Sequence, residues 1–225
     1  IYSAGGYGET GYSNQFSSYD PITGMWYAEA SMPTARMHAG AVEALGELYV
    51  IGGYNGQGLT TVEKYSLQTK TWSSAASLAN SLYAAGVCAD SEKIYVFGGV
   101  GPDGYTDAVF SYQISSNYWV QETPLPQAAA YMNAVFLDNK IYLFGGVNET
   151  GAMDTIYEYN PQDKTFRQLT GMKHYRHSAG AVALDGQIFI LGGSNANEPD
   201  IRQRAQSDFF MASVLSSAEV FDPLS

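Results

Sequence analysis

Residues 48–58 read LYVIGGYNGQG, an apolar run that ends in a Gly-Gly pair and is followed by a polar, glycine-rich loop. The same pattern returns as IYSAGGYGETG at 1–11, IYVFGGVGPDG at 94–104, IYLFGGVNETG at 141–151 and IFILGGSNANE at 188–198. Successive pairs, which begin at Gly5, Gly52, Gly98, Gly145 and Gly192, are 47, 46, 47 and 47 residues apart. A constant period of this length indicates a repeat architecture in which each unit is one supersecondary structure.

Other residues keep the same phase within the repeat. An aromatic residue follows each pair, namely Tyr19, Tyr65, Tyr112, Tyr159 and Phe221, and in four repeats a second large ring follows it, namely Trp26, Trp72, Trp119 and Phe166. Runs of small residues and valine precede the pairs, such as HAGAVEAL at 38–45. Short polar turns such as LDNK at 137–140 separate these segments, and Asp, Asn and Gly tolerate the positive φ of tight hairpins. Each unit therefore predicts a four-stranded antiparallel sheet.

These sheets carry apolar residues on both faces, so each must stack against its neighbours. Radial repetition of such sheets is an all-β β-propeller. The order of the motifs, with IYVFGG, then YDP at 19–21, then Trp26, and with Arg36 and Arg176 opening two repeats, resembles the kelch motif along essentially the whole chain. The repeats diverge at the opening position, where Leu82 and Ala129 replace arginine.

The resemblance implies one propeller domain with five recognisable blades, at about residues 1–30, 36–77, 82–124, 129–171 and 176–225. The first blade is expected to lack its inner strand and the last its outer strand, so that neither end completes the other. Six kelch repeats of this period need roughly 280 residues, and the chain has 225. We therefore expect a fragment of a six-bladed ring, and a closed five-bladed ring is the alternative.

Composition excludes several classes of function. The formal net charge of −11 argues against nucleic-acid binding, which depends on Lys and Arg that neutralise phosphates. No apolar run approaches the length of a membrane-spanning helix. Cys88 is the only cysteine, which excludes an internal disulfide framework and favours the cytoplasm, and its apolar surroundings predict a small buried side chain.

Acidic residues gather in the loops after the Gly-Gly pairs, which join the second and third strands of each blade. They are Glu9, Asp103, Asp107, Glu149, Asp154, Glu198 and Asp200. One interpretation is ordinary solvated loop polarity. The other is an acidic rim that attracts a basic peptide or cation.

The same face is expected to present the residues that directly follow the glycines, including Tyr7, Tyr54 and Ser194. In the kelch domains of ubiquitin-ligase adaptors, this position and the residues after the opening arginine line the substrate-peptide pocket. By that resemblance His38, Tyr83, Tyr131 and Ser178 complete the predicted binding set, although some of them could simply fill the central channel. Arginines that bind acidic peptides in related pockets are missing at these positions. Arg36 and Arg176 are expected to be structural and to bridge neighbouring blades.

The last repeat has a long insertion between its second and third strands. Its aromatic residue, Phe221, lies 28 residues after Gly193, whereas Tyr159 lies 13 residues after Gly146. Long loops on rigid scaffolds often carry function. Phe209 and Phe210 in this insertion, at 195–217, either fold over the blade or contact a partner.

No sequence signal indicates an enzyme. The chain has three histidines and lacks Cys/His zinc spacing, a phosphate-binding glycine loop and a GxSxG nucleophile motif, so we expect no catalytic residue, metal or cofactor. The leading hypothesis is a protein- or peptide-binding module with a basic partner, which is the substrate-recognition part of a ubiquitin ligase or an actin-associated adaptor. The alternative is a secreted or periplasmic carbohydrate-active propeller.

Overall fold

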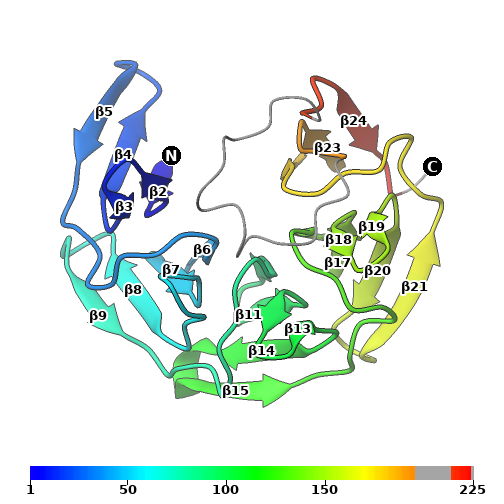
Figure 1. Cartoon of the computed structure of the whole chain (residues 1–225), viewed down its shortest axis with the longest axis horizontal. Helices are drawn as coiled ribbons and strands as arrows, with labels where there is room; N and C mark the ends of the chain where they lie inside the picture. Colours follow the sequence, from blue (N-terminus) through cyan, green and yellow to red (C-terminus); the bar gives the residue numbers. More distant parts are fainter. Residues whose placement is uncertain (196–213, 224–225) are drawn as a thin grey trace.

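Five small antiparallel sheets repeat along the chain, one for each Gly-Gly pair. The computed structural model describes residues 1–195 and 214–223. Figure 1 shows the sheets standing side by side around a common centre, like the blades of a fan. The predicted all-β propeller is confirmed, and the described helical structure is limited to one short 3-10 turn, η1 (Ile114–Ser116).

Each of the three middle blades has four strands in sequential order. They are β6 (Gly40–Ala44), β7 (Glu47–Ile51), β8 (Val62–Ser66) and β9 (Trp72–Ser74) in blade 2; β10 (Gly86–Ala89), β11 (Lys93–Phe97), β14 (Val109–Gln113) and β15 (Tyr118–Gln121) in blade 3; and β16 (Asn133–Leu137), β17 (Lys140–Phe144), β20 (Ile156–Asn160) and β21 (Thr165–Leu169) in blade 4. The first strand of each blade is the innermost.

The outer blades have three strands each among the described residues. They are β1 (Tyr2–Ala4), β4 (Phe16–Asp20) and β5 (Met25–Ala28) in blade 1, and β22 (Gly180–Leu184), β23 (Gln187–Leu191) and β24 (Ala218–Phe221) in blade 5. Among the residues that the structure describes, blade 1 thus has no inner strand and blade 5 no outer one, as predicted.

The hairpins inside the blades have turn residues that adopt the backbone conformation of a tight turn. Both central residues have positive φ at Leu45/Gly46, Asp138/Asn139 and Asp185/Gly186, which is the type I′ arrangement that matches the twist of flanking strands. The repeated aromatic residues pair across the two outer strands, with Tyr65 opposite Trp72 and Tyr112 opposite Trp119. The sequence spacing of these rings therefore reflects a hairpin of constant length.

Five apolar clusters form the core of the described residues: four lie each between two consecutive blades, and a smaller fifth, with Tyr83, Val100 and Ala130, lies under the loops that follow the Gly-Gly pairs. Phe16 of blade 1 packs with Tyr65 of blade 2, and Ile51 packs with Ile94 of blade 3. Cys88 lies in the third cluster with Leu143 and, as predicted, is buried. The fourth cluster joins blades 4 and 5. Within residues 1–195 and 214–223, no such cluster joins blade 5 to blade 1.

The Gly-Gly pairs hold consecutive blades together. The second glycine donates its N–H to the carbonyl of the residue that opens the next blade: Gly6 to Arg36, Gly53 to Leu82, Gly99 to Ala129 and Gly146 to Arg176, at 2.8–2.9 Å. The first glycine has positive φ and lies so close to this carbonyl that a Cβ built on Gly52 would be 2.1 Å from the Leu82 oxygen. Only glycine meets both conditions.

The opening arginines are structural, as predicted, but their side chains do not bridge blades. Arg36 is 1% exposed, and it donates to the carbonyls of Gly52 (2.6 Å) and Thr61 (3.1 Å) and pairs with Glu63 (2.8 Å), all in its own blade. Arg176 pairs with Glu219 in the same way, at 2.7 Å. The bridge between blades is made instead by the main-chain carbonyl of each arginine. The prediction of a side-chain bridge was therefore wrong.

Candidate functional site

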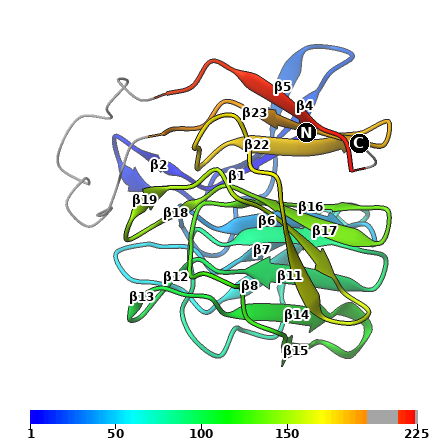
Figure 2. The same cartoon turned by 90° about the vertical axis from the view of Figure 1, so that its right-hand side faces the viewer.

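The loops after the Gly-Gly pairs are not irregular. Three of them form two-residue ladders: β2 (Tyr7–Gly8) with β3 (Gly11–Tyr12), β12 (Val100–Gly101) with β13 (Gly104–Tyr105), and β18 (Val147–Asn148) with β19 (Gly151–Ala152). In blade 2, Tyr54 bridges Gly58. Figure 2 shows these small hairpins on one side of the propeller, which we name the loop face.

A row of tyrosines crosses the loop face from blade 1 to blade 3. The ring centroids are 5.2 Å apart for Tyr7 and Tyr12, 6.0 Å for Tyr12 and Tyr54, and 5.2 Å for Tyr54 and Tyr83. We name these four residues the tyrosine row. Tyr7 is 53% exposed, Tyr12 and Tyr54 are half-buried, and Tyr83 is 7% exposed. Burial, followed by the nearby Tyr54 and Tyr7 hydroxyls, raises the pKa of Tyr12.

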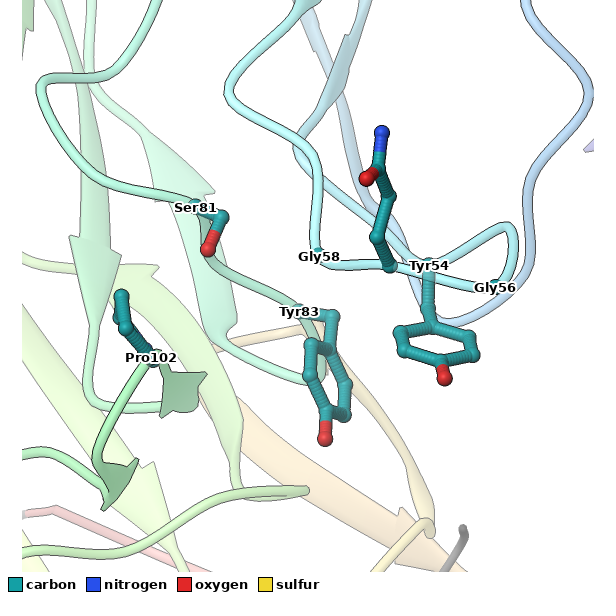
Figure 3. Close-up of a pocket in the computed structure, with 8 residues that line it drawn as sticks. Tyr54, Gly56, Gly58, Ser81, Tyr83 and Pro102 are labelled. Carbon is teal, nitrogen blue, oxygen red and sulfur yellow. The ribbon is translucent and has the colours of Figure 1, made fainter.

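A groove of about 300 Å³ lies between the loops of blades 2 and 3, at one end of the tyrosine row. It is lined by Tyr54, Gly56, Gln57, Gly58, Ser81, Tyr83, Gly101 and Pro102, none of which carries a charge. Figure 3 shows Tyr54 and Tyr83 side by side with their hydroxyls pointing the same way, and Pro102 across from them. Carboxylates stand outside the lining, with Asp103 next to Pro102 and Glu9 in the turn between β2 and β3, and both are exposed.

Four residues at equivalent positions, just before the inner strands β6, β10, β16 and β22 around the propeller axis, have left-handed backbone: His38, Ala84, Tyr131 and Ser178, with φ between 52° and 56°. We call this axial region the channel. This conformation turns each N–H toward the preceding blade, so Ala84 donates to His38, Tyr131 to Ala84 and Ser178 to Tyr131, at 2.7–2.9 Å. A series of main-chain hydrogen bonds therefore links the inner ends of blades 2 to 5. These residues hold the blades in register as well as lining the channel.

The channel side chains pack on each other. The ring of Tyr131 stands edge-on between His38 and His177, with centroid distances of 5.3 and 6.0 Å. Burial raises the pKa of the Tyr131 phenol. His38 keeps contact with solvent, yet the crowded channel desolvates its imidazole and lowers its pKa, so it is neutral at pH 7. Tyr131 is therefore held between two imidazole rings as well as by the main-chain hydrogen bonds.

Two family profiles match the chain. The profile described as the KLHDC2/KLHL20/DRC7 Kelch-repeats domain matches residues 77–216, and the Kelch motif profile matches residues 35–79. The chain belongs to the kelch-repeat family. A search of curated proteins found no match.

The kelch fold places the predicted binding residues in two groups. Tyr7, Tyr54 and Tyr83 lie in the tyrosine row, whereas His38 and Tyr131 meet in the channel. Ser178 is exposed at the channel, and Ser194 forms bridges with His177 and Val214. Phe209 and Phe210 lie outside the residues that the structure describes.

Sequence reasoning missed Tyr12 of the tyrosine row and six of the residues that line the groove, namely Gly56, Gln57, Gly58, Ser81, Gly101 and Pro102. Tyr12 is the cross-strand partner of Tyr7 in the small hairpin, and the GxxG spacing from Gly8 to Gly11 was a signal for that turn. A Cβ on Gly58 would lie 2.9 Å from the Ser81 hydroxyl oxygen, so the two residues are in close contact across the groove floor. No sequence pattern reveals this contact.

No group of three His, Cys, Asp or Glu side chains within residues 1–195 and 214–223 could hold a metal ion. In the same residues, no helix has the length and apolar character needed to cross a membrane. The described loop-face carboxylates Glu9, Asp103, Asp107 and Glu149 are exposed, and Asp154 is half-buried. The loop face therefore combines an uncharged aromatic groove with a negatively charged surround.

Proposed function

We propose that this kelch domain is a non-catalytic binding module that holds a peptide segment of a protein partner on its loop face. The observation that carries the proposal is the tyrosine row, because tyrosines supply a large contact area with a polar tip and are enriched at binding hot spots. Tyr7, Tyr12 and Tyr54 supply accessible ring surface at 5.2–6.0 Å spacing, and the buried ring of Tyr83 continues the row into blade 3. Kelch propellers are generally protein-interaction modules, which supports the same function.

The finer role that we propose is substrate recognition within a larger adaptor, such as a ubiquitin-ligase receptor or an actin-associated protein. The position of the residues after the Gly-Gly pairs supports it, since related adaptors use this position for substrate peptides. A cytoplasmic location agrees with the single buried thiol of Cys88. A basic partner is supported by the exposed loop-face carboxylates and the net charge of −11.

The test is to select a displayed library of random linear peptides on the domain and to measure the affinity of the enriched sequences. Replacing Tyr7 and Tyr54 together with alanine should raise Kd at least ~30-fold, because truncating a hot-spot aromatic costs about 2 kcal/mol or more. These two rings are chosen because Tyr83 is buried, so its loss would disturb the blade. Thermal unfolding should change little.

Tyr118→Ala is the matched control. Tyr118 is 51% exposed, close to the 53% of Tyr7, but it begins β15 at the opposite side of the propeller. This variant should bind the selected peptides as the parent does. Failure to enrich any peptide, or an equal loss of affinity in the Tyr118 and Tyr7/Tyr54 variants, would overturn the proposal.

The acidic surround makes a separate prediction. A selected peptide that contains Lys or Arg should bind several-fold more weakly in 0.5 M than in 0.05 M NaCl, because exposed charges are screened over ~3–10 Å at high ionic strength. The same peptide with glutamine at those positions should show little salt dependence. Equal salt dependence of the two peptides would mean that the carboxylates do not attract the partner.

A further inference from the structure

We infer that the groove and the tyrosine row accept a proline-rich segment in the polyproline II conformation, flanked by a basic residue. The inference rests on the proposed function, that the loop face binds a peptide, and it specifies the class of that peptide. Four features of the site carry it: the angles between the rings, the hydroxyl groups that bond to no described residue, the open groove floor at Gly58, and the distribution of charge.

The rings of the tyrosine row form notches rather than a flat platform. Neighbouring planes meet at 73° for Tyr7 and Tyr12, 66° for Tyr12 and Tyr54, and 57° for Tyr54 and Tyr83. Aromatic-lined notches of this kind accept proline rings in polyproline II recognition. A polyproline II segment rises ~3.1 Å per residue, so about five residues cover the row. A sugar ring stacks on an open, flat ring face, which steeply tilted neighbours do not provide.

The hydrogen-bonding capacity of the site suits a ligand with many acceptors. The hydroxyls of Tyr7, Tyr12 and Tyr54 make no hydrogen bond to any described residue. The Gln57 amide adds donors beside Tyr54. A polyproline II chain has no internal hydrogen bonds, so its carbonyls stay available, and each proline brings no N–H that would need an acceptor. Donors on the protein therefore match acceptors on the ligand.

Gly58 keeps the floor of the groove open. A methyl group there would lie 2.9 Å from the Ser81 hydroxyl oxygen and 3.8 Å from a ring carbon of Tyr83. The φ of Gly58 is not in the left-handed region, so its backbone conformation does not require glycine. Its small size instead allows a ligand to approach the backbone closely.

The charged residues around the groove indicate which residues should flank the proline segment of the ligand. All eight residues that line the groove are uncharged, while exposed Asp103 follows Pro102 at the blade 3 end and Glu9 lies near Tyr7 at the blade 1 end. A basic residue beside the proline segment would thus meet a carboxylate in either chain direction. Charge complementarity of this kind increases the association rate and favours one class of partner.

The test uses a fluorescein-labelled peptide of eight prolines with one arginine at each end, and fluorescence anisotropy with the intact 225-residue chain. The comparison peptide keeps both arginines and replaces the prolines with alternating glycine and serine. We expect the proline peptide to bind at least ~10-fold more tightly, and Tyr54→Ala and Gly58→Ala each to weaken it at least ~5-fold. Two control variants, Tyr118→Ala and Gly8→Ala, should change Kd less than ~2-fold. The methyl group that Gly8→Ala adds has no atom within 4 Å.

Three results would overturn the inference. Equal binding of the two peptides would show that only the arginines matter. Displacement of the proline peptide from the Tyr54 site by cellohexaose would indicate a sugar site. The third result is that the proline peptide does not bind, although proline-free library peptides bind and need Tyr7 and Tyr54. This result would contradict the inference and leave the proposed function intact. If no library peptide binds either, both fail. Thermal melts of Gly58→Ala and Tyr54→Ala establish that any loss occurs in folded protein.

Discussion

Alanine at Gly52 should reduce the free energy of unfolding by about 4 kcal/mol, whereas alanine at Gly192 should cost only about 1 kcal/mol. Both glycines open a Gly-Gly pair, and both have left-handed φ, of 60° and 64°. They differ in what the added methyl group meets. At Gly52 it would be 2.1 Å from the Leu82 carbonyl oxygen of the next blade, and at Gly192 the nearest described atom is the Leu215 carbonyl oxygen, at 3.5 Å.

The difference between the two variants isolates the contact between blades. In both variants a side chain in the left-handed backbone conformation costs roughly 1–2 kcal/mol. Only Gly52→Ala also forces neighbouring backbones apart. Urea unfolding of the two variants measures the difference, and Gly8→Ala serves as the control because its methyl group meets nothing within 4 Å. Equal losses at Gly52 and Gly192 would mean that conformational strain alone, rather than packing of the next blade, requires the glycine.

The repeat contacts explain why the blade plan could be predicted from the sequence. Local geometry requires three features of each blade: a glycine close to a carbonyl, an aromatic pair across a hairpin, and a turn such as Asp-Asn or Asp-Gly. They therefore recur at the same position in successive repeats. Trp72 and Trp119 illustrate this, since each donates its indole N–H to a carbonyl of the segment before its own blade, Ala30 or Ala76. Residues that make such contacts recur with the repeat period, so they can be recognised in the sequence.

The loop face could be predicted only in part because its contacts do not recur. The position after the second glycine is Tyr7, Tyr54, Val100, Val147 and Ser194 in successive blades. The position of Tyr7 and Tyr54 within the repeat therefore located these two residues. The burial of Tyr83, which is 7% exposed, depends instead on its packing with Val100 and Ala130 from other segments. Tyr12 joins the row only because its loop folds into a hairpin.

The side-chain partners of the arginines were also missed, although the sequence held a signal. In each of blades 2 to 5, one residue of the third strand lies opposite the residue two positions before the Gly-Gly pair. These four equivalent residues are Glu63, Phe110, Tyr157 and Glu219. The blades that open with Arg36 and Arg176 carry glutamate there, while those that open with Leu82 and Ala129 carry an aromatic residue. The two positions therefore vary together between repeats, as two side chains in contact do.

This pairing leads to the second large effect. Arg36→Leu alone should cost about 3–5 kcal/mol, because it leaves the Glu63 carboxylate buried and without its cation. The side chains of this pair are 0% and 7% exposed. Adding Glu63→Phe, which copies the Leu82 and Phe110 pair of blade 3, should restore stability to within about 1–2 kcal/mol of the parent. Denaturant unfolding of the two single variants and the double variant measures the coupling.

The double variant separates a lost ion pair from simple mispacking. In Arg36→Leu the buried Glu63 carboxylate keeps the hydrogen bond from the Thr34 hydroxyl, at 2.6 Å, but loses the cation that compensates its charge. Replacing this carboxylate with a phenylalanine side chain removes the uncompensated charge, so it should recover most of the lost stability. A double variant no more stable than Arg36→Leu would show that Arg36 contributes packing and carbonyl hydrogen bonds, and that Glu63 does not depend on its charge.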